Sequence, residues 1–191
     1  PLGTCGLVRN VVVLLPGESD TALLLSSHYD SAPSGPGASD DGASVAILVE
    51  LLRDRVRQPR KNSLIFLWND GEEQGLLGSL AFMREQPLAA RVGAVFNLEA
   101  RGSSGISQLF QSTADSEWMV RAFADKARRP FATSVSDAVL RWMPNYNDLV
   151  VFDSYGVPGV AFAFAESEAR YHSATDTVAN LSLGSLQSQG D

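Results

Sequence analysis

Residues 63–69 read Ser-Leu-Ile-Phe-Leu-Trp-Asn, a short and almost continuous apolar run. A strand that is apolar on both faces is typical of a parallel sheet covered by helices on both sides. The neighbouring segments fit that arrangement, because apolar residues recur at helical spacing in residues 43–57, and residues 76–84 are expected to be helical. Residues 63–69 are therefore predicted to form a buried strand between two helices.

The alternation of strands and helices extends along the rest of the chain. Further strands are expected at residues 11–15, 21–27, 92–98, 108–111 and 160–164, and further helices at 116–128, at 148–154 and from 182 onward. This order predicts the α/β class, as a three-layer α/β/α sandwich with a central, mostly parallel mixed sheet. The chain shows no internal repeat or linker, so residues 1–191 are expected to form a single domain.

Two finer predictions concern the packing of these elements. Strands 11–15 and 21–27 are joined by Pro-Gly-Glu-Ser-Asp and are predicted to pair as a hairpin. The apolar stripes of the helices at 43–57 and 116–128 are expected to face the core. They consist of Val45, Leu48, Val49, Leu52 and Val56 in the first helix, and of Trp118, Val120, Phe123 and Ala127 in the second.

Composition and charge narrow the class of protein. The 191 residues are 45% hydrophobic and 19% charged, which is ordinary for a globular protein. The net charge of −7 argues against a nucleic-acid partner, because phosphate binding favours a basic face. No apolar run approaches the roughly 20 residues of a membrane span. Cys5, the one cysteine, cannot form a disulfide within the chain.

Histidines and acids gather at the places where strands end and loops begin, which is where ligands collect in open α/β sheets. Each cluster taken alone has an ordinary explanation. An acid pair before a helix is usually a cap, and adjacent glutamates in a turn are usually solvated. The clusters are His28 with Asp30, the pair Asp40-Asp41, the pair Glu72-Glu73, Glu99, and Tyr171 with His172.

Taken together, the clusters indicate a site of imidazole nitrogens and carboxylate oxygens. Both histidines of the chain belong to them, and such donors are typical of zinc. His28 and Asp30 are two residues apart, so in extended chain they share a side. A carboxylate there can accept the second ring N–H of a metal-bound imidazole. No cysteine takes part, which argues against a structural zinc finger.

Five short motifs occur in a characteristic order. They are His-x-Asp, Gly-Ala-Ser-Asp-Asp-Gly, Asp-Gly-Glu-Glu-Gln-Gly-Leu-Leu-Gly-Ser, Asn-Leu-Glu, and Tyr-His-Ser-x-x-Asp-Thr. In these motifs the chain resembles metallopeptidase family twenty-eight, the co-catalytic dizinc aminopeptidases, from about Arg9 to Asn180. Within that family it is most similar to the membrane-anchored branch of the endoplasmic reticulum and vacuole, which shares the Asn-Leu-Glu and Tyr-His motifs.

The resemblance implies a cofactor of two zinc ions per chain. His28, Asp40 and Glu99 would hold one zinc, and Asp40, Glu73 and His172 the other, with Asp40 bridging the two. Many relatives place Asp where this chain has Glu99. Both residues can ligate a metal, but the longer side chain can alter the geometry of the site.

The resemblance also implies roles beyond ligation. Glu72 would be the general base, and Asp30 would orient His28 without itself ligating the metal. Tyr171 would donate a hydrogen bond to the oxyanion of the reaction. The family has a cis peptide bond after its bridging aspartate, which corresponds here to Asp40-Asp41.

The implied activity is that of a zinc-dependent exopeptidase, specifically an aminopeptidase acting on peptide substrates. One alternative is a glutaminyl-cyclase-like acyltransferase with a single zinc on the same fold. Such enzymes carry an insertion after the Glu-Glu pair, whereas here only Gln-Gly-Leu-Leu separates Glu73 from Gly78. The other alternative is a non-catalytic interaction domain. The intact set of implied ligands and Glu72 favour the peptidase.

Three expectations concern the context of the domain. The resemblance suggests an extracytoplasmic location, with a membrane anchor outside this segment, so the chain is interpreted as a domain excised from a longer protein. The sequence leaves the oligomeric state and the side-chain preference open. Aromatic and sulfur-containing side chains are candidates for lining a specificity pocket, namely Trp142, Met143, Phe162 and Phe164.

Overall fold

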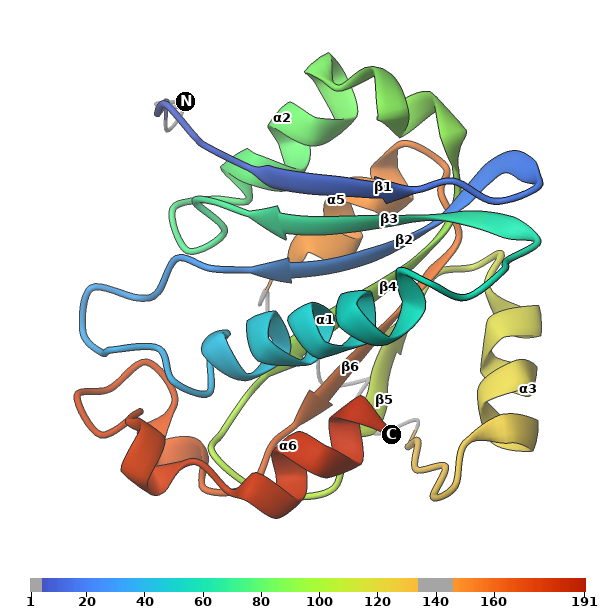
Figure 1. Ribbon diagram of the computed structural model, residues 1–191. Helices are drawn as coiled ribbons and strands as arrows, with labels where there is room; N and C mark the ends of the chain where they lie inside the picture. Colours follow the sequence, from blue (N-terminus) through green and yellow to red (C-terminus); the bar gives the residue numbers. More distant parts are fainter. Residues whose placement is uncertain (1–4, 134–145) are drawn as a thin grey trace.

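The computed structural model describes residues 5–133 and 146–191, and within these ranges one six-stranded sheet organises the chain (Figure 1). The spatial order of the strands is β1-β3-β2-β4-β6-β5. Their bounds are Val11–Leu15 (β1), Ser19–His28 (β2), Asn62–Asn69 (β3), Val92–Ala100 (β4), Gln108–Ser112 (β5) and Gly159–Phe164 (β6). All the predicted strands are present, and β2 and β4 extend far enough to include His28 and Glu99.

The directions of the strands bring several loops to one edge of the sheet. The inner strands β3, β2, β4 and β6 are parallel to one another. The outer strands β1 and β5 are antiparallel to their neighbours. The sheet is therefore mixed and mostly parallel, as predicted. Because the parallel strands end at the same edge, toward the left in Figure 1, the loops that follow them meet there.

The predicted hairpin of the first two strands is wrong, because β3 lies between them. β1 pairs with β3, with Val11 opposite Trp68 and Leu15 opposite Leu64. The connection crosses the start of β3, where the N–H of Glu18 donates to the carbonyl of Arg60. Residues 24–26 of β2 are buried and need a hydrogen-bonded neighbour on each side, which β3 and β4 supply. β1 is partly exposed and is suited to the edge.

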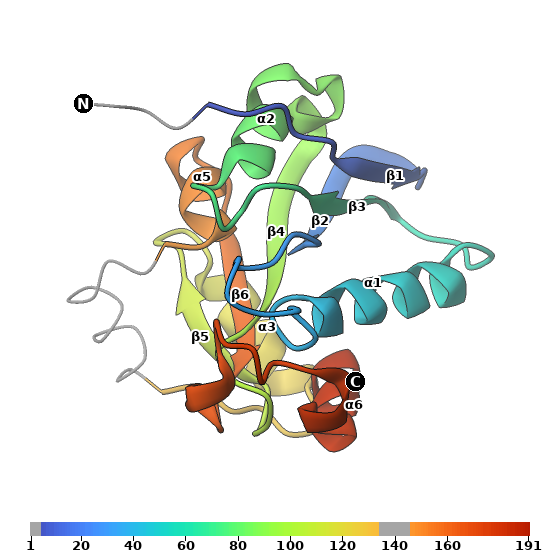
Figure 2. The ribbon, with the colours of Figure 1, turned by 90° about the vertical axis from the view of Figure 1, so that its left-hand side faces the viewer.

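Helices cover both faces of the sheet and complete the predicted α/β/α sandwich (Figure 2). α1 (Gly42–Arg55), α3 (Glu117–Lys126) and α6 (Leu183–Gly190) pack on one face, and α2 (Leu77–Glu85) and α5 (Asp148–Ser154) on the other. Adjacent residues of β2 point to opposite layers, Leu25 to the α1 side and Leu24 to the α2 side. Short 3₁₀ segments are η1 (Pro87–Arg91), η2 (Glu168–Arg170) and η3 (Val178–Asn180).

The predicted inner faces of two helices are only partly right. In α1 the buried apolar residues are Ala43, Ile47 and Leu48, whereas Val49 is 41% exposed. In α3 Met119 is buried and Trp118 is 55% exposed. Each helix rests on the sheet with one narrow stripe, so apolar residues beside that stripe remain in contact with water.

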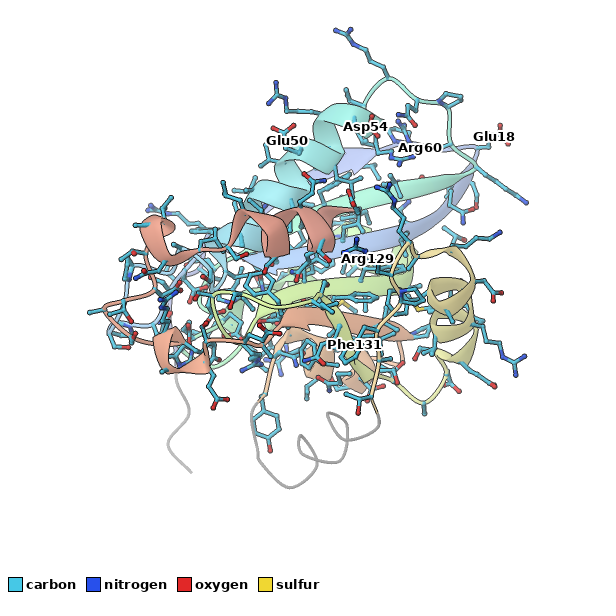
Figure 3. All side chains as sticks on the ribbon, turned by 90° about the horizontal axis from the view of Figure 1, so that it is seen from below. Glu18, Glu50, Asp54, Arg60, Arg129 and Phe131 are labelled. Atoms are coloured by element: carbon cyan, nitrogen blue, oxygen red, sulfur yellow. The ribbon has the colours of Figure 1, made fainter. Side chains whose placement is uncertain are left out.

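The outer side of α1 is solvated. Its acids Glu50 and Asp54 extend away from the sheet (Figure 3) and form exposed ion pairs with neighbouring arginines of the same helix. No helix in the described ranges has both the length and the apolar character needed to cross a bilayer.

Candidate metal centre

The predicted site residues lie at the carboxyl edge of the parallel strands. His28 is the last residue of β2, and Glu99 is the penultimate residue of β4. Glu72 and Glu73 follow the end of β3, and His172 follows β6 through η2. Figure 2 views the molecule from this edge. Residues that are more than 140 positions apart in the chain are neighbours there because the parallel strands end together.

Asp40 stands between the two histidines. One of its carboxylate oxygens, Oδ1, lies 3.3 Å from His28 Nε2, and the other, Oδ2, lies 3.0 Å from His172 Nε2. Burial by itself would raise the pKa of the Asp40 carboxyl, but hydrogen bonds from His172 and His28 lower it to about 2. The carboxylate therefore stays ionised, with one oxygen directed at each imidazole.

Two overlapping sets of ligand atoms share Asp40. His28, Asp40 and Glu99 form one set, and Asp40, Glu73 and His172 form the other. The ligand atoms within each set all lie within 4.8 Å of one another. Glu99 Oε2 is 3.8 Å from His28 Nε2, and Glu73 Oε1 is 3.1 Å from His172 Nε2.

The donor atoms of both sets fit zinc. Each set offers imidazole nitrogen and carboxylate oxygen, which are common zinc ligands. Glu73 Oε1 is buried, and apart from its approach to His172 Nε2 it has no hydrogen-bond partner among the described residues, so it is available to a cation. Acids crowded in this way also repel one another unless protons or cations relieve them, and this repulsion favours a bound metal.

The loop before α1 sets the direction of Asp40. Buried Asp176 accepts the backbone N–H of Ser39 at 2.8 Å and that of Asp40 at 3.1 Å. Gly37 has a φ of +67°, and a Cβ there would lie 2.8 Å from the carbonyl oxygen of Asp40. The peptide bond between Asp40 and Asp41 is cis, as the resemblance implied. Glycine and Asp176 therefore determine how this loop presents its acid.

Asp30 links the loop after β2 to the loop after β3. Its two carboxylate oxygens accept the backbone N–H groups of Glu72 and Glu73, each at 3.1 Å. Oδ1 also lies 3.5 Å from His28 Nδ1, and the backbone carbonyl of Asp30 lies 3.0 Å from the same nitrogen. One acid thus contacts the histidine and holds both glutamates.

Glu99 is held from its own strand. Asn97, two residues earlier on the same side of β4, donates to Glu99 Oε1 at 2.9 Å. Burial raises the pKa of Glu99 to about 7, with the positive charge of His28 acting in the opposite direction. The second oxygen, Oε2, is the one that faces His28.

Glu72 belongs to neither ligand set but adjoins both. Burial, and then the charges of Glu99 and Asp148, raise the pKa of Glu72 to about 10. Nearby cations favour the ionised form of a carboxyl, so a bound metal would lower the pKa of Glu72. A carboxyl beside a metal site and outside its ligand set is suited to proton transfer.

Tyr171 stacks on His172, with ring centroids 3.7 Å apart and an angle of 20° between the ring planes. Its hydroxyl oxygen accepts a hydrogen bond from Arg101 Nη1 at 2.6 Å. His172 has a φ of 52°, a left-handed conformation that residues other than glycine seldom adopt. Ser34 Oγ donates to the carbonyl of His172 at 2.6 Å and helps to hold this backbone.

Three residues of the site were not assigned a role from the sequence. Arg101 directly follows β4. Its charge at the end of a buried strand could have indicated a functional role. Asp148 stands in the first turn of α5, where acids are common, yet it is fully buried and accepts from Asn69 Nδ2 at 2.5 Å. Asp176 belongs to the Tyr-His-Ser-x-x-Asp-Thr motif, but its contact with the Asp40 loop follows only from the fold.

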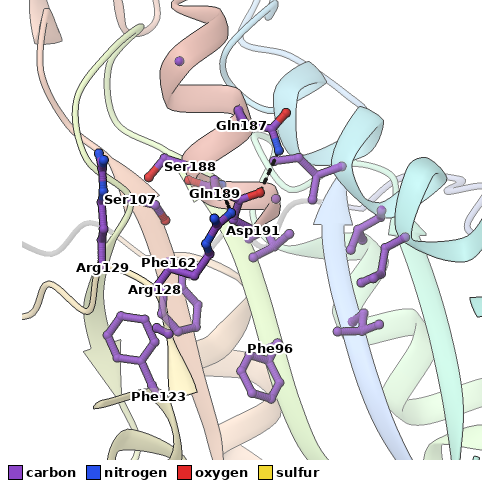
Figure 4. A pocket seen from close by; sticks show the side chains of 18 residues that line it. Phe96, Ser107, Phe123, Arg128, Arg129, Phe162, Gln187, Ser188, Gln189 and Asp191 are labelled. Carbon is purple, nitrogen blue, oxygen red and sulfur yellow. Dashed lines mark hydrogen bonds and ion pairs between the residues drawn. The ribbon is translucent and has the colours of Figure 1, made fainter. Parts of the chain in front are cut away.

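A separate hollow of about 600 Å³ lies under α1, α3 and α6 (Figure 4). Its floor includes Phe96 and Phe162, and its rim includes Arg128 and Asp191. No residue of either ligand set lines it. Phe164, another predicted pocket residue, is buried against Ala43 and Ala100. The remaining two, Trp142 and Met143, lie outside the described residues.

The fold and the site together define the class of metal-dependent hydrolases that use histidine and carboxylate ligands at the carboxyl edge of a sheet. Residues 10–191 match the profile described as Peptidase family M28, and the chain belongs to that family. The resemblance stated from the motifs is thereby confirmed.

Curated relatives agree with this family. Endoplasmic reticulum metallopeptidase 1 of Mus musculus is 35% identical over 191 residues, which cover 96% of this chain and 21% of the relative. The vacuolar membrane protease of Yarrowia lipolytica is 36% identical over 186 residues, covering 93% of this chain and 18% of the relative. The chain thus spans about a fifth of the length of these relatives.

Solved structures share the fold. A zinc aminopeptidase from Bacillus subtilis has a TM-score of 0.73 at 23% identity, over 95% of this chain and 47% of that one. A glutaminyl cyclase from an Acidobacteriales bacterium has a TM-score of 0.71 at 22% identity, over 96% of this chain and 70% of that one. At such identities these structures establish the fold alone.

Proposed function

We propose that this chain is the catalytic domain of a two-zinc exopeptidase that removes N-terminal residues from peptides. The observation that carries this proposal is the position of Asp40, whose two oxygens face His28 at 3.3 Å and His172 at 3.0 Å. A carboxylate directed at two imidazoles in this way is suited to bridging two metal ions.

In this proposal His28, Asp40 and Glu99 hold one zinc, and Asp40, Glu73 and His172 hold the other. When bound, the two ions would supply Lewis-acid chemistry, which activates water and polarises a peptide carbonyl. His28 and Glu99 are almost completely buried, whereas His172 is 38% exposed. The site containing His172 is therefore the more accessible of the two.

The residues of the chain perform the proton transfers. Glu72 takes a proton from the attacking water and passes one to the leaving amine. The hydroxyl of Tyr171 donates a hydrogen bond to the oxygen that becomes negative in the tetrahedral intermediate. The free amine of the substrate is attracted by Glu72 and Glu99, and this attraction would select for an unblocked N-terminus.

Two other functions are compatible with the fold. A single-zinc glutaminyl cyclase would need only one of the two ligand sets, whereas both sets are assembled here. A non-catalytic interaction domain would have no use for Glu72, which is held beside the ligand sets by its backbone bond to Asp30. Both observations favour the peptidase.

The relatives suggest where the domain works. The names of the two curated relatives refer to the endoplasmic reticulum and to the vacuolar membrane. We infer an extracytoplasmic location for this domain, attached to a membrane through segments outside residues 1–191. Peptides with a free N-terminus are its proposed substrates.

The test combines elemental analysis with peptide cleavage. The purified chain should contain two zinc ions and should release N-terminal residues from a library of peptides with free N-termini. The same peptides with acetylated N-termini should not be cleaved. One zinc per chain together with cyclisation of N-terminal glutamine would favour the cyclase. Two zinc ions without turnover of either substrate class would favour the non-catalytic domain.

A further inference from the structure

Arg101 brings a positive charge to a site made mostly of acids. It lies directly after β4, two residues beyond Glu99, and its side chain is partly buried. Its guanidinium carbon lies 5.4 Å from the centre of the Tyr171 ring and 5.8 Å from the centre of the Phe110 ring. These aromatic contacts limit where the guanidinium can move.

The polar contact of Arg101 is with the hydroxyl of Tyr171. Nη1 donates to the tyrosine oxygen at 2.6 Å, a short distance that indicates a strong bond from a charged donor. A guanidinium has no acceptor atoms. The hydroxyl proton of Tyr171 therefore cannot point at Arg101 and remains available to another acceptor.

The position of Tyr171 suggests which acceptor this is. Its ring lies against the ring of His172, whose Nε2 is 3.0 Å from Asp40 and 3.1 Å from Glu73. The hydroxyl thus belongs to a residue fixed at the edge of the ligand sets. A hydroxyl oxygen that accepts a bond from a cation also becomes a stronger donor through its own proton, because the two bonds polarise each other.

We propose that Arg101 is a positioning residue for the reaction, and that it fixes and polarises the hydroxyl of Tyr171 so that the tyrosine donates to the developing oxyanion of the substrate. This inference rests on the proposed peptidase function. It assigns Arg101 an effect on the transition state that depends on the presence of the Tyr171 hydroxyl.

A competing role for Arg101 is that of a counter-charge to Glu99. In that role its loss would weaken zinc binding or stability and would act independently of Tyr171. The two roles predict different behaviour when both residues are changed, because residues that act through each other have non-additive effects.

The experiment is a double-mutant cycle on the zinc-loaded chain with Arg101→Met, Tyr171→Phe and both changes together. Tyr171→Phe should lower kcat by about 10²–10³-fold, the usual effect of losing one oxyanion donor. Arg101→Met should lower kcat by about 10-fold or more with a smaller change in KM, but by less than about 3-fold when Tyr171 is already Phe. Arg101→Lys should recover part of the loss, because lysine can still donate to the hydroxyl.

Two readouts do not depend on turnover. Zinc content should stay at two per chain in all variants. Calorimetry measures the affinity for a phosphinic dipeptide, which mimics the tetrahedral intermediate. This affinity should fall in each single variant, and the double variant should lose less than the sum of the two single losses. Arg121→Met, which removes an exposed arginine of α3, should leave every quantity unchanged.

Additive losses in an active enzyme, or a loss confined to zinc content, would overturn the role of Arg101 and leave the peptidase proposal intact. A zinc-loaded wild-type chain that neither cleaves peptides nor binds the phosphinic dipeptide would overturn both.

Discussion

The carboxylate of Asp30 accepts the backbone N–H of Glu72 at 3.1 Å, and this bond ties the end of β2 to the loop that follows β3. The second oxygen of Asp30 makes the same bond to Glu73. The proposed general base and a proposed zinc ligand are therefore held by one side chain. Because Asp30 also contacts His28, it connects both ligand sets.

Asp30→Ala should weaken zinc binding by about 10–100-fold, the usual effect of losing a residue that orients metal ligands. Activity at saturating zinc should also fall, because Glu72 loses its backbone anchor. Zinc titration and peptide cleavage measure the two effects. Asp20→Ala is the matched control, since the side chain of Asp20 is fully exposed. Unchanged zinc affinity in Asp30→Ala would show that the loops hold the ligands without this acid.

Glu72→Gln should lower kcat by about 10²–10⁴-fold, because the amide cannot accept the proton of the attacking water. Its zinc content should remain at two per chain, since Glu72 belongs to neither ligand set. Glu73→Gln is the contrasting variant and should lose zinc. An active Glu72→Gln enzyme would remove Glu72 from the role of general base.

Asp40→Ala should lose both metal ions, because each ligand set contains one oxygen of this residue. Loss of a single ion is the expected result for Glu99→Ala or His172→Ala. Elemental analysis after dialysis against a low concentration of zinc distinguishes these outcomes. Asp54→Ala on the solvated side of α1 serves as the control. Two ions retained in Asp40→Ala would refute the bridging role.

The metal-free protein should lose stability as the pH rises from about 5 to about 8. Glu72 has a pKa of about 10 and Glu99 a pKa of about 7 in the folded chain, against an ordinary value of 4.5. Between the unfolded and folded values the folded state binds more protons, so the free energy of unfolding falls with pH. The pKa of His28, which is also raised, acts in the same direction.

Urea unfolding of the chelator-treated protein at several pH values measures this slope. The lowered pKa of Asp40 contributes little to it, because that carboxyl stays ionised throughout the range. Glu72→Gln should flatten the slope, and added zinc should restore stability at pH 8 by binding the folded state. Stability that is constant or rises with pH would contradict the crowding of acids described for this site.

Much of the fold could be predicted from local patterns. The apolar run at 63–69 and the helical spacing at 43–57 correspond to β3 and α1, and the α/β class followed from their alternation. The pairing of β1 could not be predicted in the same way. A connection such as Pro16–Glu18 suits a hairpin, but it also suits a chain that crosses a neighbouring strand, and only the burial of β2 on both sides decides between them.

For the candidate site, too, the sequence could predict some features and only the fold shows the others. The sequence could select His28, Asp40, Glu72, Glu73 and His172 because they follow strand ends or precede a helix and together match a known set of motifs, although each cluster alone has an ordinary explanation. Their approach to within ligand distance is a property of the fold, and their binding of zinc stays a prediction. The contact of Arg101 with Tyr171 spans 70 positions of the chain, so no local pattern could predict that these two residues meet.

The sequence by itself determined which segments are strands and helices and which side chains offer imidazole or carboxylate groups, because periodicity and side-chain chemistry are properties of short segments. Only the tertiary structure decided the strand order, the place of Asp40 between two histidines and the burial of Asp148. These depend on how the whole chain satisfies its backbone hydrogen bonds and buries its apolar surface at once.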